Sequence, residues 1–89
     1  MIETQVEIVN KLGLHARAAA KFVGCASAFA STIHAGKDGK MIDGKSIMSV
    51  MMLAAAKGTE LELHIEGEDE QRALDAISGL VNGCFGEGE

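Results

Sequence analysis

The sequence predicts an α+β fold, in which a four-stranded antiparallel sheet is covered on one face by three helices. Two observations carry this prediction. Four segments resemble one-sided strands, two of them with clear apolar and polar alternation, and three segments repeat apolar residues at helical spacing. The 89 residues, 47% of them hydrophobic, suffice for one domain, residues 1–89. The expected order is β-α-β-β-α-β-α, without a linker or an internal repeat.

The first half of the chain is expected to hold three strands and one helix. Residues 2–9 alternate as a half-buried strand does. Their first face consists of Ile2, Thr4, Val6 and Ile8. From Ala16 to Ala30 the apolar spacing is helical, and the alanine run 18–20 favours helix. Residues 31–35 and 41–43 form a short hairpin around an Asp-Gly turn.

The second half is expected to hold two helices and one strand. Ser46 is a good N-cap for a helix from Ile47 to about Ala56, which Lys57 and Gly58 would end. Residues 59–66 alternate as a strand does. Acidic residues at 68–70 favour the start of a last helix. Its apolar positions are Ala73, Leu74, Ile77, Leu80, Val81 and Cys84. The tail, residues 86–89, is expected to be frayed.

Composition excludes several classes of function. The formal net charge of −5 argues against a general nucleic-acid-binding protein, although Lys11, Arg17 and Lys21 give one basic region. No apolar run approaches the ~20 residues that cross a membrane, and residues 1–10 do not resemble a signal peptide. The chain is therefore expected to be cytoplasmic. Cys25 and Cys84 leave a disulfide open, but reduced, apolar packing is favoured in that compartment.

The segment GLHARAAA, residues 13–20, carries most of the functional information. His15 stands at the expected start of a helix, where unpaired N–H groups and the helix dipole attract anions. A neutral imidazole there is a nucleophile that can accept a phosphoryl group, and the backbone amides of Ala16 and Arg17 are placed to contact it. The guanidinium of Arg17 adds a planar fork for phosphate oxygens. A capping histidine and a solvated arginine are the plainer alternatives.

Two motifs together resemble the histidine-containing phosphocarrier protein (HPr) family of the bacterial phosphotransferase system. They are GLHARAAA and GKSIMSVMMLAAAKG, residues 44–58, and the resemblance covers residues 1–85. It implies an open-faced β-sandwich and a phosphoryl group carried on Nδ1 of His15. It also implies that enzyme I donates this group from phosphoenolpyruvate and that IIA-type proteins accept it. The protein would then be a carrier in a relay rather than an enzyme, a monomer without a cofactor.

One position departs from the family pattern. Family members commonly have proline where this chain has Ala18, and proline suits the first helical turn because the N–H it lacks has no partner there. Ala18 also favours helix, so the chemistry at His15 and Arg17 is expected to survive. Such departures resemble the nitrogen-related branch of the family, NPr, in proteobacteria. The output implied is then sugar uptake or regulation.

The second motif suggests regulation and docking. In some family members the serine that matches Ser46 is phosphorylated by an HPr kinase/phosphorylase, whereas an N-cap role alone would also explain this residue. The apolar residues that follow exceed what one buried stripe needs, and methionine suits a surface that meets several partners. The expected docking residues are Ile47, Met48, Met51 and Met52, with Met48 the most exposed.

Two other functions remain open from the sequence. One is a regulatory binding module of the same fold that acts by docking, with Ser46 as its kinase site. The other is a small metal-binding protein, since His34 and His64 accompany the two cysteines. No spacing among these residues is typical of a zinc site, so no metal is expected. Both histidines are expected to face solvent.

Overall fold

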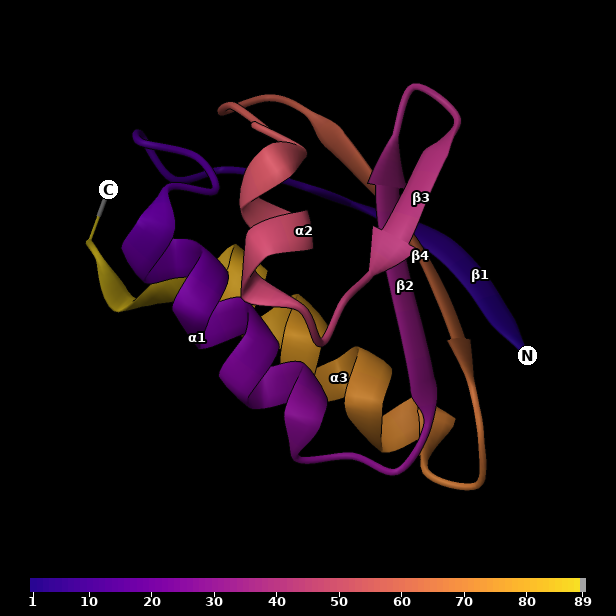
Figure 1. Ribbon diagram of the computed structural model, residues 1–89. Helices are drawn as coiled ribbons and strands as arrows, with labels where there is room; N and C mark the ends of the chain where they lie inside the picture. The colour runs from indigo at the N-terminus through magenta and orange to yellow at the C-terminus, as the bar shows by residue number, and fades with distance from the viewer. Residues whose placement is uncertain (89) are drawn as a thin grey trace.

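The computed structural model describes residues 1–88 and has the predicted α+β architecture (Figure 1). Four antiparallel strands form one sheet in the order β1-β4-β2-β3. The strands are β1 (Ile2–Glu7), β2 (Thr32–Lys37), β3 (Lys40–Asp43) and β4 (Glu60–Glu66). The helices are α1 (Ala16–Ser27), α2 (Ile47–Met52), α3 (Glu70–Asn82) and a short 3₁₀ turn, η1 (Cys84–Gly86).

The pairing of β1 with β4 follows from the alternation seen in the sequence. β1 and β4 pair so that Ile2 lies opposite Ile65 and Val6 lies opposite Leu61. In β4, Leu61, Leu63 and Ile65 are fully buried, while the intervening residues reach solvent. A slip of one residue would bring the charged face into the core, so this register is strongly specified.

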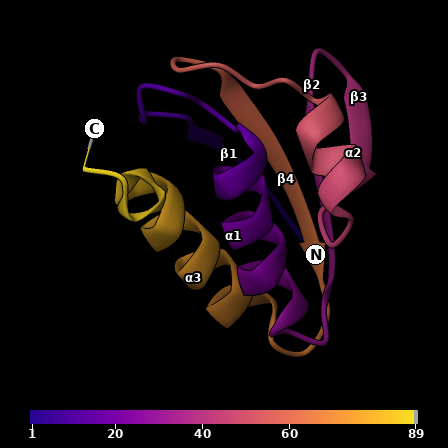
Figure 2. The ribbon, with the colours of Figure 1, turned by 60° about the vertical axis from the view of Figure 1, so that its left-hand side comes forward.

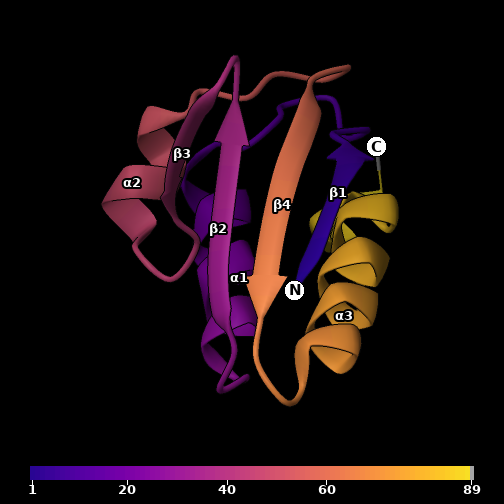
Figure 3. The same ribbon diagram turned by 90° about the vertical axis from the view of Figure 1, so that its right-hand side faces the viewer.

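The helices lie on one face of the sheet and leave the other face open, as Figures 2 and 3 show from two sides. α1 and α3 pack against each other, α3 contacts β1 and β4, and the buried residues of α1 join the same hydrophobic core. The largest side chains with no exposed surface are Phe22 of α1 and Phe85 of η1. The other large core residues are Ile8, Ile33, Val50, Leu61, Leu63, Ile65, Ile77 and Val81. The core is therefore almost wholly aliphatic.

The second helix is shorter than predicted. Helix α2 ends at Met52 with Leu53 as its C-cap, and Ala54 has a positive φ of 51°, so the expected extension to Ala56 is wrong. Tertiary contacts outweigh the helix propensity of the alanines. The carbonyl of Ala54 accepts a hydrogen bond from Lys37 Nζ (3.3 Å), and the carbonyl of Ala55 accepts one from the Leu14 amide (2.8 Å).

The C-terminal segment also differs from the prediction. α3 ends at Asn82, and the chain then turns through positive φ angles at Cys84 (57°) and Phe85 (54°). Burial of Phe85 fixes this turn, and Glu87 forms hydrogen bonds with residues near α1. The expectation of a frayed tail is therefore wrong for Glu87, while residue 89 lies outside the described residues.

Two smaller expectations concern α1 and the cysteines. α1 ends at Ser27, so the expected continuation to Ala30 is wrong, because the Ala30 amide instead donates to Asp69 Oδ2 (2.9 Å).

Cys25 and Cys84 are both free and half-buried. Burial raises the pKa of the Cys25 thiol, which favours its neutral form. None of the helices within residues 1–88 is long and apolar enough to span a membrane.

Asp69 holds the connection between α1 and β2. Its carboxylate accepts hydrogen bonds from the Ser31 hydroxyl, the Ala30 amide (2.9 Å) and the Ser31 amide (3.0 Å). These bonds, led by that of the Ser31 hydroxyl, lower the pKa of Asp69 from 3.8 to about 2. Asp69 therefore stabilises the fold above about pH 4, and this stabilisation is lost as the pH falls through about 2.

Replacement of Asp69 tests this connection. We expect Asp69→Asn to lower the melting temperature at pH 7, because its amide N–H₂ would face the Ala30 N–H with no acceptor between them. The variant should also lose less stability than the wild type between about pH 4 and 2. Thermal unfolding followed by circular dichroism checks both, with the exposed Glu68→Gln as control. Equal acid sensitivity of Asp69→Asn and wild type would contradict the assignment.

Candidate functional site

His15 is the N-cap of α1, as the sequence predicts. Its backbone is extended (φ −74°, ψ 178°), its carbonyl accepts the Ala19 amide (2.8 Å), and its side chain makes no capping bond. The imidazole is instead directed into a surface pocket with 29% of its surface exposed. Because the first amides of a helix lack partners within it, Ala16 and Arg17 present backbone N–H groups beside this ring.

The loop before α1 is held by a close backbone approach. Gly13 has a φ of 67°, and a Cβ there would lie 2.5 Å from the Ala55 carbonyl oxygen. This position therefore requires glycine. The next residue, Leu14, is buried and donates its amide to the same carbonyl (2.8 Å). The glycine and leucine of the GLHARAAA motif thus fix the position from which His15 enters the pocket.

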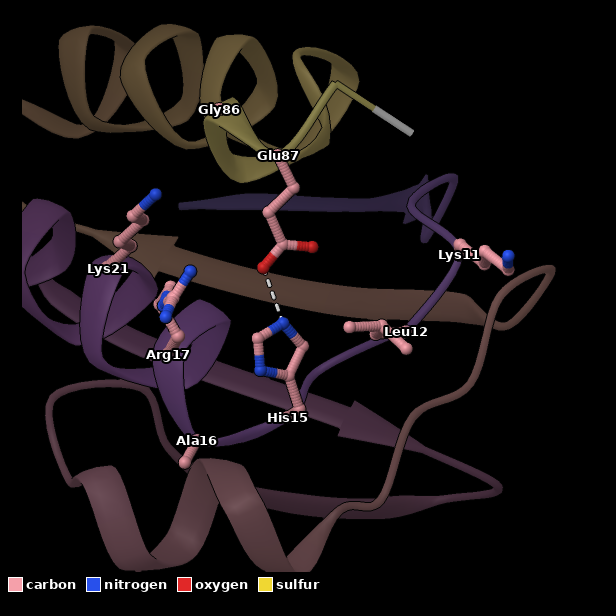
Figure 4. A pocket seen from close by; sticks show the side chains of 8 residues that line it. All are labelled: Lys11, Leu12, His15, Ala16, Arg17, Lys21, Gly86 and Glu87. Carbon is pink, nitrogen blue, oxygen red and sulfur yellow. Dashed lines mark hydrogen bonds and ion pairs between the residues drawn. The ribbon is translucent and has the colours of Figure 1, made fainter.

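The two nitrogens of the imidazole have different surroundings (Figure 4). Nε2 is hydrogen-bonded to Oε2 of Glu87, a residue 72 positions further along the chain. Nδ1 is turned toward the first turn of α1, on the side of Ala16, and has no hydrogen-bond partner within residues 1–88. Nδ1 is therefore the ring nitrogen that an incoming group can reach beside the helix start.

A buried asparagine supports the glutamate. Asn10 has no exposed surface, and its Nδ2 donates both to Glu87 Oε1 (3.0 Å) and to the Gly13 carbonyl (2.8 Å). It therefore ties the tail to the loop that carries His15. Asn10 Oδ1 is buried without a hydrogen-bond partner in the described residues.

Cations surround this part of the surface. The pocket has a volume of about 680 Å³ and one carboxylate, that of Glu87, among its lining residues. The lining residues are Lys11, Leu12, His15, Ala16, Arg17, Lys21, Gly86 and Glu87. Arg17 and Lys21 lie one helical turn apart, and Lys21 Nζ donates to the Phe85 carbonyl (2.6 Å). The excess of positive charge suits an anion such as a phosphoryl group.

The glutamate in the pocket is ionised more readily than usual. Its burial alone would raise its pKa, but the hydrogen bonds from Asn10 and His15, together with the positive charge of Lys21, outweigh that effect. The pKa of Glu87 is therefore lowered. At neutral pH this carboxylate is an acceptor only, so a proton in its bond with His15 belongs to Nε2.

The structure brings His15, Ala16 and Arg17 into one pocket, and it places the other predicted residues on the neighbouring α2, which packs against α1. Ser46 is the N-cap of α2, and its hydroxyl accepts the Ser49 amide (3.3 Å). The four expected docking residues are all exposed. Their exposed fractions are 44% for Ile47, 69% for Met48, 38% for Met51 and 70% for Met52. Met52 is thus as exposed as Met48.

The sequence did not single out Glu87 or Asn10. A glutamate near the chain end and an asparagine in a loop have no spacing that relates them to His15. Lys21, which the sequence placed in the basic region near His15, follows Arg17 by four residues and shares its helix face. The placement of Glu87 depends on the buried Phe85 and the left-handed turn before it, which are tertiary effects.

The other two histidines lie away from this pocket. His34 and His64 are opposite each other on β2 and β4, where they are exposed and half-buried respectively. His64 Nε2 is bonded to Glu62 Oε2 (2.7 Å) on the same strand. Within residues 1–88 no three or more His, Cys, Asp or Glu side chains are grouped so that they could hold a metal ion.

Comparisons with known proteins identify relatives of this chain. Residues 2–83 match the family model described as PTS HPr component phosphorylation site. The chain is 54% identical to the phosphocarrier protein HPr of Neisseria meningitidis, over the whole of both chains. It is 47% identical to the HPr-like protein Crh of Bacillus subtilis, over 91% of this chain and 95% of that protein.

A solved structure has the same fold. HPr from Thermoanaerobacter tengcongensis superimposes with a TM-score of 0.93 at 47% sequence identity, with 98% of each chain covered. Together with a histidine at a helix start in a cationic pocket, these matches establish the family. The chain belongs to the HPr family of phosphocarrier proteins of the phosphotransferase system.

Proposed function

We propose that this chain carries a phosphoryl group on Nδ1 of His15, which it accepts from enzyme I and passes to IIA-type proteins. The observation that carries the proposal is the orientation of the His15 ring. Nε2 is occupied by Glu87, and Nδ1 faces the free amides at the start of α1. The acceptors serve sugar uptake or regulation, and the protein acts as a relay in the cytoplasm rather than as a catalyst.

Transfer to the ring is a displacement at phosphorus. The Nδ1 lone pair attacks, an Nδ1–P bond forms, and the bond between phosphorus and the donor breaks with its electron pair remaining on the donor. The helix amides and Arg17 stabilise the charge on the phosphoryl oxygens. Since Arg17 is exposed and the pocket is open to solvent, this stabilisation is modest. A carrier requires such a balance, because a tightly held group would not be passed on.

The methionine patch, defined as Ile47, Met48, Met51 and Met52, is the proposed docking surface for these proteins. Its side chains are exposed on α2, and α2 packs against the helix that begins at His15. The exposed side chain of Leu12 adds apolar surface to the pocket that contains His15. Flexible thioether side chains can adapt to donor and acceptor surfaces of different shape.

The phosphorylation site can be tested directly. Incubation with enzyme I and phosphoenolpyruvate is expected to add the mass of one phosphoryl group, in a form that is acid-labile and stable to base. His15→Ala should abolish this label, whereas the matched control His64→Ala should keep it, because His64 lies on the sheet. Mass spectrometry of the intact protein measures both. Failure of the wild type to take up any label would contradict the carrier function.

Arg17 has a separate test. We expect Arg17→Ala to slow transfer to His15 by roughly tenfold to a hundredfold, since charged hydrogen bonds contribute about 1.5–3 kcal/mol. The fold should be unchanged because the side chain is exposed. Arg72→Ala, which removes an exposed arginine from α3, is the matched control. Stopped-flow or quenched-flow kinetics measures the rate of phosphorylation of His15 in both variants. Wild-type rates in both would contradict the role assigned to Arg17.

A regulatory role through docking is the second candidate, and one observation favours it. The relative Crh is described as a catabolite-repression HPr, and the match extends over 91% of this chain. In this alternative an HPr kinase/phosphorylase modifies Ser46. A phosphate at this helix start would add negative charge beside the methionine patch and repel an acidic partner, without unfolding α2.

Two variants of Ser46 separate capping from regulation. Ser46→Ala removes the acceptor for the Ser49 amide and is expected to lower the free energy of unfolding by about 0.5–2 kcal/mol. Ser46→Asp keeps a capping oxygen, so its stability should stay near that of the wild type while its phosphorylation by enzyme I becomes slower. Denaturant unfolding and transfer kinetics give the two readouts. Wild-type kinetics in Ser46→Asp would argue against regulation by charge.

A further inference from the structure

The chain end forms part of the pocket that surrounds His15. Phe85 is fully buried, and the left-handed turn at positions 84–86 directs the tail back over the start of α1 (Figure 1). The Glu87 side chain is only 13% exposed. Both of its carboxylate oxygens have partners, His15 for one and Asn10 for the other.

This contact determines which tautomer the imidazole adopts. A neutral imidazole carries its proton on one nitrogen and a lone pair on the other. The ionised carboxylate accepts a hydrogen bond and cannot donate one, so it selects the form with the proton on Nε2. The lone pair is then on Nδ1, the nitrogen that faces the helix start.

We propose that Glu87 is a positioning residue for phosphoryl transfer, which holds His15 as its Nε2–H tautomer and balances the positive charge that the ring acquires on phosphorylation. The inference rests on the proposed function of His15. Asn10 supports it, since this buried side chain links Glu87 to the Gly13 carbonyl and so fixes the carboxylate relative to the loop. Carboxylate groups orient the reactive histidines of many enzymes in a similar way.

The hydrogen bond between Glu87 and Nε2 of His15 helps both steps, acceptance of the phosphoryl group and its onward transfer. When the Nδ1–P bond forms, Nε2 keeps its proton, so the ring becomes a cation and Glu87 is its counter-ion. When phosphorus is transferred onward, the bonding electrons return to Nδ1, and the ring leaves as a neutral imidazole because Nε2 is still protonated. Loss of that proton would require an imidazolate leaving group, which is much poorer.

The other charged groups in the pocket cannot replace this carboxylate. Lys11, Arg17 and Lys21 are cations, and they would oppose a positive ring. Lys21 Nζ is hydrogen-bonded to the Phe85 carbonyl (2.6 Å), so it helps to hold the tail in place. Glu87 is the one acidic side chain among the pocket residues that the structure describes.

Two substitutions distinguish the hydrogen bond from the charge. Glu87→Ala removes both, whereas Glu87→Gln removes the charge and keeps an amide oxygen that can accept from Nε2. Nitrogen-15 NMR of the neutral ring is expected to report almost only the Nε2–H tautomer in the wild type, a weaker preference in Glu87→Gln, and in Glu87→Ala only the modest preference of a free histidine side chain. Transfer from enzyme I should be roughly tenfold slower in Glu87→Ala, as expected for one charged hydrogen bond.

The controls separate this inference from the proposed function. Glu66→Gln changes an exposed carboxylate on the sheet and should behave as wild type. If the wild type is labelled by enzyme I, but both Glu87 variants keep its tautomer or its rate, the positioning role is overturned and the carrier function stands. If the wild type is not labelled, the carrier function fails, and the tautomer measurement still decides whether Glu87 orients the ring.

Discussion

The close approach of Gly13 to the backbone of Ala55 is the constraint on which the relative positions of α1 and α2 depend. The absence of a Cβ at Gly13 lets the loop before α1 touch the segment after α2, and the Leu14 amide then bonds to the Ala55 carbonyl. This contact holds the loop that leads to His15 against the segment that follows the exposed methionine side chains of α2. A side chain at position 13 would separate them, so the glycine of the motif serves the site as much as the fold.

Much of the fold could be predicted from the sequence, because apolar periodicity reports burial. Alternation in residues 2–9 and 59–66 placed the two long strands within two residues of their observed bounds. Helix α2 was predicted too long, because propensity cannot reveal that the carbonyls of Ala54 and Ala55 bond to Lys37 and Leu14. The alanines after Met52 favour helix locally, but hydrogen bonds to residues distant in the sequence end α2 at Met52.

The residues of the candidate site also differ in whether local sequence or tertiary contacts place them. His15 and Arg17 could be recognised because the chemistry of anion binding at a helix start is local, and a short motif contains all of it. Glu87 could not, because its position follows from the burial of Phe85 and from three residues with positive φ. The result is a histidine with one nitrogen held and the other open, in a pocket that is cationic but accessible. Those properties suit a group that must be accepted and released.

The nitrogen that carries phosphorus tests this arrangement most directly. Long-range hydrogen–nitrogen NMR of the nitrogen-15-labelled protein, phosphorylated by enzyme I and phosphoenolpyruvate, distinguishes the two substituted forms of the ring. Phosphorus on Nδ1 of His15, with a proton kept on Nε2, is the expected result. Phosphorus on Nε2 would contradict the orientation described for His15, because that nitrogen is the one that Glu87 occupies.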